Sequence, residues 1–242
     1  MSGHSKWSTI KRQKGAADLK RGQTFTKLSN AITIAIKESG GITDPDSNFR
    51  LRLAIDAARA ANMPKDNIQR AIERFNSKNT NNIDEVMYEG FGPYGIGVIV
   101  KGATDNKMRT TSEVKNIFER FGGNMGQIGS VSYLFKQLGK LKLKKGSHTL
   151  DEIFLIAADC GAEDVVEDEE IIVFTKPEEL ANVRNVFIQK GIDIEEEELT
   201  YLPQTYVKIS EEEQINKVVL FLDKIEEQDD VQKIYSNAEL DN

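Results

Sequence analysis

The apolar residues of this chain change their spacing once, near residue 80, and that change limits the folds the chain can adopt. Before this point they recur every three or four positions, as at Phe25, Leu28, Ile32 and Ala35, which is the spacing of one helix face. After the polar segment 77–84 they fall in short β-branched runs typical of strands. The pattern predicts a helical bundle followed by α+β domains whose sheets are backed by helices.

Three domains are expected from the order of these segments. A helical domain would cover residues 1–78, with the polar stretch SKNTNNID as the boundary. An α+β domain would comprise residues 79–135 and 204–242, with a second α+β domain, residues 136–203, inserted in it. Strands are expected in GIGVIVKG, SVSYLF, KLKLK, EEIIVFT, IDIEEEELTYL, TYVKIS and DVQKIYS, and helices in RTTSEVKNIFERFGG, LDEIFLIAADCG, PEELANVRNVFIQKG and EEEQINKVVLFLDKIEEQ.

Charge is distributed unevenly along the chain. The formal net charge is −7, yet residues 1–78 contain 15 basic and 7 acidic residues, while residues 79–242 contain 17 basic and 32 acidic ones. The first 37 residues hold eight cations against one acid, Asp18. Such asymmetry indicates an anionic partner for the N-terminal part. The acidic runs 167–170 and 195–198 are expected to be solvated faces and poor surfaces for nucleic acid.

Composition also bears on the compartment. No apolar run approaches the roughly 20 residues that a membrane helix needs, and no apolar export segment follows the charged N-terminus. The single cysteine, Cys160, excludes an intramolecular disulfide and favours a reducing compartment. We therefore expect a cytoplasmic protein without membrane contact.

Motifs for catalysis, cofactors and metals are weak. Gly90, Gly92 and Gly95 have the spacing GxGxxG, but they lead into a β-branched run instead of opening a helix, so a glycine turn or close backbone contact is the better interpretation. The two histidines, His4 and His148, have no cysteine partners at zinc-site spacing. We expect no enzyme activity, no cofactor and no metal.

The basic N-terminal segment SKWSTIKRQKGAADLKRGQTFTK carries the candidate site. Helical stretches would place its cations in stripes suited to phosphates, and Trp7 could stack on a base or pack on the bundle. A solubilising surface is the alternative for the cluster. The expected nucleic-acid-binding residues are His4, Ser5, Lys6, Trp7, Lys11, Arg12, Lys14, Lys20, Arg21 and Lys27, with His4 and Ser5 as hydrogen-bond partners.

Five blocks of sequence resemble the YebC/PmpR family. They are GHSKWSTIKRQKGAADLKRGQTFTKL, GGITDPDSNFRLRLAIDAARAANMPKDNIQRAIER, YEGFGPYGIGVIVKGATDNKMRTTSEVKNIFERFGGN, GSVSYLF and CGAEDVVED, and they cover nearly the whole chain in order. The chain departs from the family pattern at Lys107-Met108, where Arg-Asn is more usual, and at residues 75–77, where the family has a glycine-containing linker. The first departure weakens any role assigned to residues 105–109.

The resemblance implies a helical N-terminal domain and two α/β domains arranged openly around a cleft. It also implies a DNA-binding transcriptional regulator, which is the function we expect. Relatives described as ribosome-associated factors leave RNA binding and promotion of translation open, and a protein-interaction adaptor is a third alternative. The expected partners are DNA, or ribosomal or messenger RNA, together with the ribosome or RNA polymerase.

Overall fold

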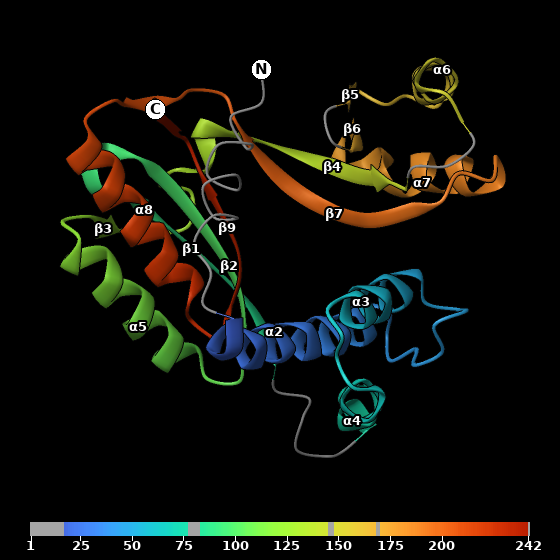
Figure 1. Ribbon diagram of the computed structural model, residues 1–242, viewed down its shortest axis with the longest axis horizontal. Helices are drawn as coiled ribbons and strands as arrows, with labels where there is room; N and C mark the ends of the chain where they lie inside the picture. The colour runs from blue at the N-terminus through green and yellow to red at the C-terminus, as the bar shows by residue number, and fades with distance from the viewer. Residues whose placement is uncertain (1–16, 77–82, 145–147, 168–169, 242) are drawn as a thin grey trace. The chain divides into compact units, whose positions relative to one another are not determined.

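The computed structural model describes residues 17–76, 83–144, 148–167 and 170–241, with side chains from residue 22 onward except that of Asn76 (Figure 1). The chain divides into two compact units, one formed by residues 1–135 with 203–242 and the other by residues 136–202. No helix in the described ranges combines the length and the apolar character required to cross a membrane.

Three helices form the N-terminal part of the first unit: α2 (Ala17–Glu38), α3 (Phe49–Ala60) and α4 (Lys65–Asn76). Their shared core is built from residues at helical spacing, namely Ile32, Ala35, Ile36, Leu51, Ile55, Ala58, Met63, Ile68 and Ala71. Asn48 caps α3 by accepting from the Leu51 N–H at 3.0 Å, and its amide donates to the Ala35 carbonyl of α2 at 3.1 Å. One buried amide therefore fixes both the start of α3 and its attachment to α2.

The rest of the first unit is an antiparallel sheet covered by two helices. Its strands are β1 (Asp84–Phe91), β2 (Gly97–Thr104), β3 (Asn124–Met125) and β9 (Val231–Ser236), in the order β3-β1-β2-β9. Helices α5 (Lys107–Arg120) and α8 (Glu212–Glu226) share one core with this sheet, and Phe118 meets Phe221 edge to face at 5.1 Å. Two further strands, β8 (Val207–Ile209) and β10 (Ala238–Leu240), pair in parallel.

The second unit has the chain order β4 (Phe135–Leu143), α6 (Leu150–Asp159), β5 (Asp164–Glu167), β6 (Ile171–Thr175), α7 (Leu180–Gln189) and β7 (Ile194–Pro203). The sheet order β5-β6-β4-β7 is that of a split βαβ, or ferredoxin-like, domain. Its core contains Leu141, Val173, Val183 and Phe187, all fully buried. The alternating positions of β4 and β6 and one face of each helix supply this core.

The predicted α+β fold class is confirmed, but one predicted strand is wrong. SVSYLF does not form a strand, because Ser132–Leu134 is a turn of 3-10 helix and β4 begins only at Phe135. The amides of Val131 and Ser132 donate to the buried Glu89 carboxylate at 2.9 and 2.8 Å instead of to a neighbouring strand. Four short or weakly patterned strands, β1, β3, β5 and β10, had not been predicted.

The glycine motif leads from one strand into another. Gly90 lies in β1, and a Cβ there would come within 2.5 Å of the Asn124 carbonyl oxygen of β3. Gly95 adopts a φ of +78° in the turn before β2. Close strand packing and a left-handed turn therefore explain these glycines.

Candidate nucleic-acid interface

The predicted phosphate-binding residues lie mainly within the first 21 residues of the chain. His4, Ser5, Lys6, Trp7, Lys11, Arg12 and Lys14 fall outside the described residues, and Lys20 and Arg21 belong to α2, where only their backbone is described. Lys27, further along α2, is half-buried and its contacts are described. The assignment of these residues to nucleic acid stays a prediction.

Lys27 and Gln23 reach the C-terminal end of α8. The Lys27 ammonium donates to the Glu226 carbonyl at 2.5 Å, and the Gln23 amide donates to the Glu227 carbonyl at 2.9 Å. The last carbonyls of a helix have no partner within the helix, and a cation there is favoured by the helix dipole. Figure 1 shows the start of α2 beside the end of α8. Both side chains thus cap α8, and the Glu226 carbonyl occupies one of the three N–H donors of Lys27.

A second attachment of α2 lies near its C-terminal end. Lys37 pairs with Asp84 of β1 at 3.1 Å and also donates to the Ile83 carbonyl at 2.8 Å. Asp84 accepts a second ion pair, from Lys107 of α5, at 3.0 Å. The contacts with Lys107 and Lys37 hold the pKa of the Asp84 carboxyl below its usual value. Helix α2 is therefore joined to the sheet part of its unit at two separate points.

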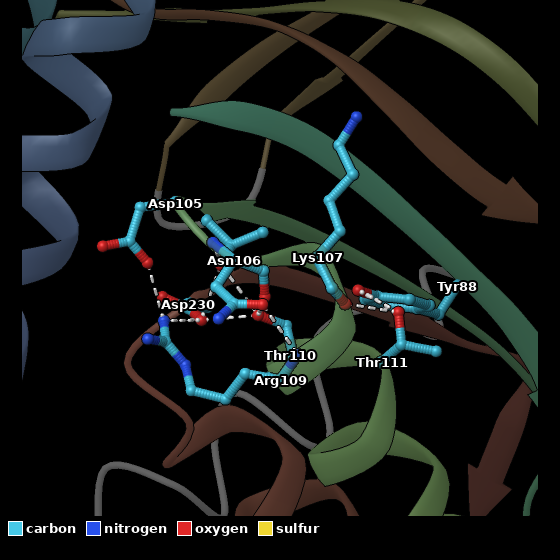
Figure 2. A network of polar contacts seen from close by, with 9 residues as sticks. Tyr88, Asp105, Asn106, Lys107, Arg109, Thr110, Thr111 and Asp230 are labelled. Carbon is cyan, nitrogen blue, oxygen red and sulfur yellow. Dashed lines mark hydrogen bonds and ion pairs between the residues drawn. The ribbon is translucent and has the colours of Figure 1, made fainter. Parts of the chain in front are cut away.

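A polar network fixes the start of α5 (Figure 2). Asn106 caps the helix by accepting from the Arg109 N–H at 3.1 Å. The Asp230 carboxylate, whose side chain is 14% exposed, accepts from Thr104 at 2.9 Å, Arg109 at 2.8 Å and Thr110 at 2.6 Å. Burial opposes ionisation of Asp230, but these hydrogen bonds outweigh it and lower its pKa. The network ties together β2, α5 and the turn before β9.

The guanidinium of Arg109 is also bound by Asp105, at 3.0 Å, so two carboxylates raise its pKa, Asp230 more than Asp105. In Figure 2 the Lys107 side chain points away from this cluster, while Tyr88 and Thr111 face each other, with their oxygens 3.1 Å apart. Sequence reasoning missed Asp230, because its partners lie more than 100 residues away along the chain. The one local pattern that points to this network is Asn106, a residue type that commonly caps the start of a helix.

A hollow of about 410 Å³ opens beside the network. Its lining comes from α2, α4, α5 and the segments just before β1, α5 and β9. It consists of Gln23, Thr26, Asn30, Arg74, Ile83, Asp105, Arg109, Glu113, Glu227, Gln228, Asp229 and Asp230. Five of these residues are acidic and two are arginines, one of which is already paired with two carboxylates. The local charge is therefore unsuited to a phosphate.

The second unit balances much of its acidity internally. Lys140 of β4 pairs with Glu196 and Glu198 of β7, and Lys142 pairs with Glu195. Arg184 of α7 pairs with Glu197, whose side chain is 3% exposed. We expected residues 195–198 to form a solvated face. This is wrong for Glu197, whose side chain is buried and paired with Arg184 of α7.

The described ranges hold neither a cluster of metal ligands nor an activated thiol. No group of three His, Cys, Asp or Glu side chains there could hold a metal ion. Burial raises the pKa of the Cys160 thiol, whose Sγ donates to the Ala157 carbonyl, so this thiol is not an activated nucleophile.

Comparison with known proteins gives matches over nearly the full length. Residues 5–78 match the family model described as the TACO1/YebC protein N-terminal domain, and residues 83–238 match the TACO1/YebC second and third domain. Proteins of Persephonella marina and Nitrosococcus oceani, both named probable transcriptional regulatory protein, are 46% and 48% identical, each over 99% of this chain and 96% of the relative. The crystal structure of a conserved hypothetical protein from Aquifex aeolicus is similar with a TM-score of 0.78, at 39% identity, covering 95% of this chain and 96% of that one.

Proposed function

The chain belongs to the TACO1/YebC family, and on this premise we propose that it is a non-enzymatic regulatory protein that binds nucleic acid through its basic N-terminal segment. The observation that carries the proposal is the charge of that segment, with eight cations against one acid in the first 37 residues. Phosphate neutralisation by lysine and arginine supplies most of the affinity of non-specific nucleic-acid binding. We assign this role to Lys6, Lys11, Arg12, Lys14, Lys20 and Arg21, with Trp7 as a stacking residue and His4 and Ser5 as hydrogen-bond partners.

Regulation of transcription is the first candidate activity. It is supported by the names of the relatives, which describe probable transcriptional regulatory proteins. In this form of the proposal the target is duplex DNA in the cytoplasm, and the acidic α+β part contacts other proteins such as RNA polymerase.

Binding of ribosomal or messenger RNA in support of translation is the second candidate. It is favoured by the mixed charge of α4, where Asp66 and Glu73 lie among Lys65, Arg70 and Arg74. A helix in the major groove lies between two phosphate backbones. The exposed carboxylates of Asp66 and Glu73 would be repelled there, so α4 is poorly suited to reading the major groove. RNA recognition needs only shape, backbone and stacking contacts.

Two experiments separate these candidates. Gel shifts at moderate salt with duplex DNA and with structured RNA test binding itself, and a protein that binds neither would be an interaction adaptor, contrary to the proposal. Sedimentation of cell lysate with and without RNase then tests the target. RNase-sensitive migration with ribosomes would favour translation, and a defined promoter footprint without ribosome migration would favour transcription.

A further inference from the structure

A second hollow, of about 280 Å³, lies between α2 and α4. The lining residues that matter here are Phe25, Asn30, Met63, Arg70, Ala71 and Arg74. The complete lining contains two arginines and no carboxylate, in contrast to the neighbouring hollow beside Asp230. The hollow therefore accepts an anion that the other one would repel.

Asn30 gives this hollow an unusual feature. The residue is 8% exposed and faces both hollows, and within the described part of the chain no hydrogen bond joins its side-chain amide to another residue. Its amide atoms are not among the buried side-chain atoms that lack a partner, so the amide reaches the open space of the hollows and is available to a ligand. A free amide offers donors and an acceptor side by side, which is the pattern that matches the edge of a nucleobase.

The remaining lining supports the same kind of ligand. Phe25, Met63 and Ala71 provide apolar walls, and Met63 and Ala71 are themselves 7% and 2% exposed. At the rim, the Arg70 guanidinium is held by the Asn67 side chain at 2.6 Å and by the Asp66 carbonyl at 3.2 Å. A guanidinium oriented in this way suits a phosphate oxygen or the face of an aromatic ring.

We propose that this hollow binds one unstacked nucleotide of a single-stranded or looped nucleic acid. The base lies against the apolar walls and hydrogen-bonds the Asn30 amide, while Arg70 and Arg74 contact the adjoining phosphate. The volume is close to the lower limit of roughly 300 Å³ for small-molecule sites, which fits a single nucleotide. A base inside an intact duplex cannot enter such a site without leaving the stack. The inference rests on the proposed nucleic-acid binding and adds the form in which the strand is recognised.

The test uses Asn30→Leu, which keeps the size of the side chain and removes its hydrogen-bonding groups. The full-length protein is titrated with a fluorescein-labelled RNA hairpin that has an unpaired loop, with the loop sequence alone as single-stranded DNA, and with a blunt DNA duplex. We expect Asn30→Leu to weaken binding of the hairpin or of the single-stranded DNA about tenfold, and of the duplex by much less. The melting temperature should stay nearly unchanged, because the substitution removes no hydrogen bond between described residues.

Arg70→Ala is the second variant, and Arg59→Ala is its matched control. Both arginines are exposed on the helical part, but Arg59 pairs with Asp56 and does not line the hollow. Arg70→Ala should weaken hairpin binding several-fold more than Arg59→Ala does. If only the single-stranded DNA responds, the nucleotide is a deoxynucleotide, and the inference stands.

Two results would overturn the inference. If Asn30→Leu and Arg70→Ala bind the hairpin and the single-stranded DNA as the unaltered protein does, the hollow is not a nucleotide site, although nucleic-acid binding itself stands. If the unaltered protein binds none of the three probes, the proposed function fails and this inference fails with it.

Discussion

At the scale of single residues, Asp230 is a carboxylate with several hydrogen-bond partners that the sequence did not point to. Asp230 accepts hydrogen bonds from three side chains on β2 and α5, and its own carbonyl accepts from the Ala103 N–H at 2.7 Å. Its partners come from distant parts of the chain, so no local pattern could have predicted them. The caps at Asn48 and Asn106, by contrast, are typical of side chains that precede a helix.

Removing the Asp230 carboxylate should destabilise the fold. Asp230→Ala leaves the hydroxyls of Thr104 and Thr110 without this acceptor and loses a charge-assisted bond to Arg109. We expect the free energy of unfolding to fall by about 2–3 kcal/mol in urea denaturation. The control Asp105→Ala removes a carboxylate that is 62% exposed, and should cost less than about 1 kcal/mol. Equal losses in the two variants would contradict this account.

The same residue should make stability depend on pH. The pKa of Asp230 is lowered in the folded protein from an ordinary value of 3.8, so its ionised form stabilises the fold above that value. This contribution is lost as the pH falls through the folded pKa. Asp230→Asn should therefore lose less stability than the unaltered protein between about pH 6 and about pH 3 in urea denaturation. Parallel pH profiles would show that Asp230 does not contribute.

At the scale of secondary-structure elements, helices were easier to predict than strands. The helices α2 to α8 were all expected, because each carries a continuous apolar face and several end in glycine or begin after a cap. Strand β1 was missed, since it follows a polar linker and contains acidic positions and Gly90. The SVSYLF segment has strand composition, but a buried glutamate takes its amides. Whether a segment forms a strand thus depends more on contacts with distant parts of the chain than on its local sequence.

Capping of α8 by α2 leads to a prediction about Lys27. Lys27→Met keeps most of the apolar stem but loses the hydrogen bond to Glu226, and should lower the free energy of unfolding by about 1 kcal/mol. We expect the salt dependence of nucleic-acid binding to stay as it is in the unaltered protein, because this ammonium binds a carbonyl. If the slope of log K against log salt becomes less negative by about one in Lys27→Met, Lys27 contacts a phosphate instead.

At the scale of the whole molecule, charge is separated between parts of the chain. Residues 136–202 contain 8 basic and 16 acidic residues, whereas the first 37 residues contain eight basic residues and one acidic one. Composition along the chain revealed this separation directly. The sequence did not show which acidic residues form ion pairs. The pairs of Lys140, Lys142 and Arg184 form only because the fold places β4 and α7 beside β7.

The unit formed by residues 136–202 should be dispensable for binding. The two points at which the chain leaves and re-enters the first unit lie next to each other. The Gln204 N–H donates to the Leu134 carbonyl at 2.8 Å there. Replacing residues 136–202 with a short glycine-rich turn should give a folded protein that binds nucleic acid with similar affinity and a faster association rate, since acidic residues are removed. Circular dichroism and stopped-flow anisotropy would test this. Loss of binding by a folded variant would show that the acidic unit takes part in recognition.

The central claim is that the basic N-terminal segment grips phosphates. The direct measurement is a salt titration of nucleic-acid affinity for the unaltered protein and for Lys11→Glu, Arg12→Glu, Lys14→Glu combined. A control reverses three exposed lysines of the acidic unit, Lys144, Lys176 and Lys190. We predict a log–log slope of about −4 to −6 on duplex DNA for the unaltered protein and for the control. The N-terminal variant should lose binding while its melting temperature stays nearly unchanged. Undiminished binding by that variant would contradict the claim and place the site elsewhere on the molecule.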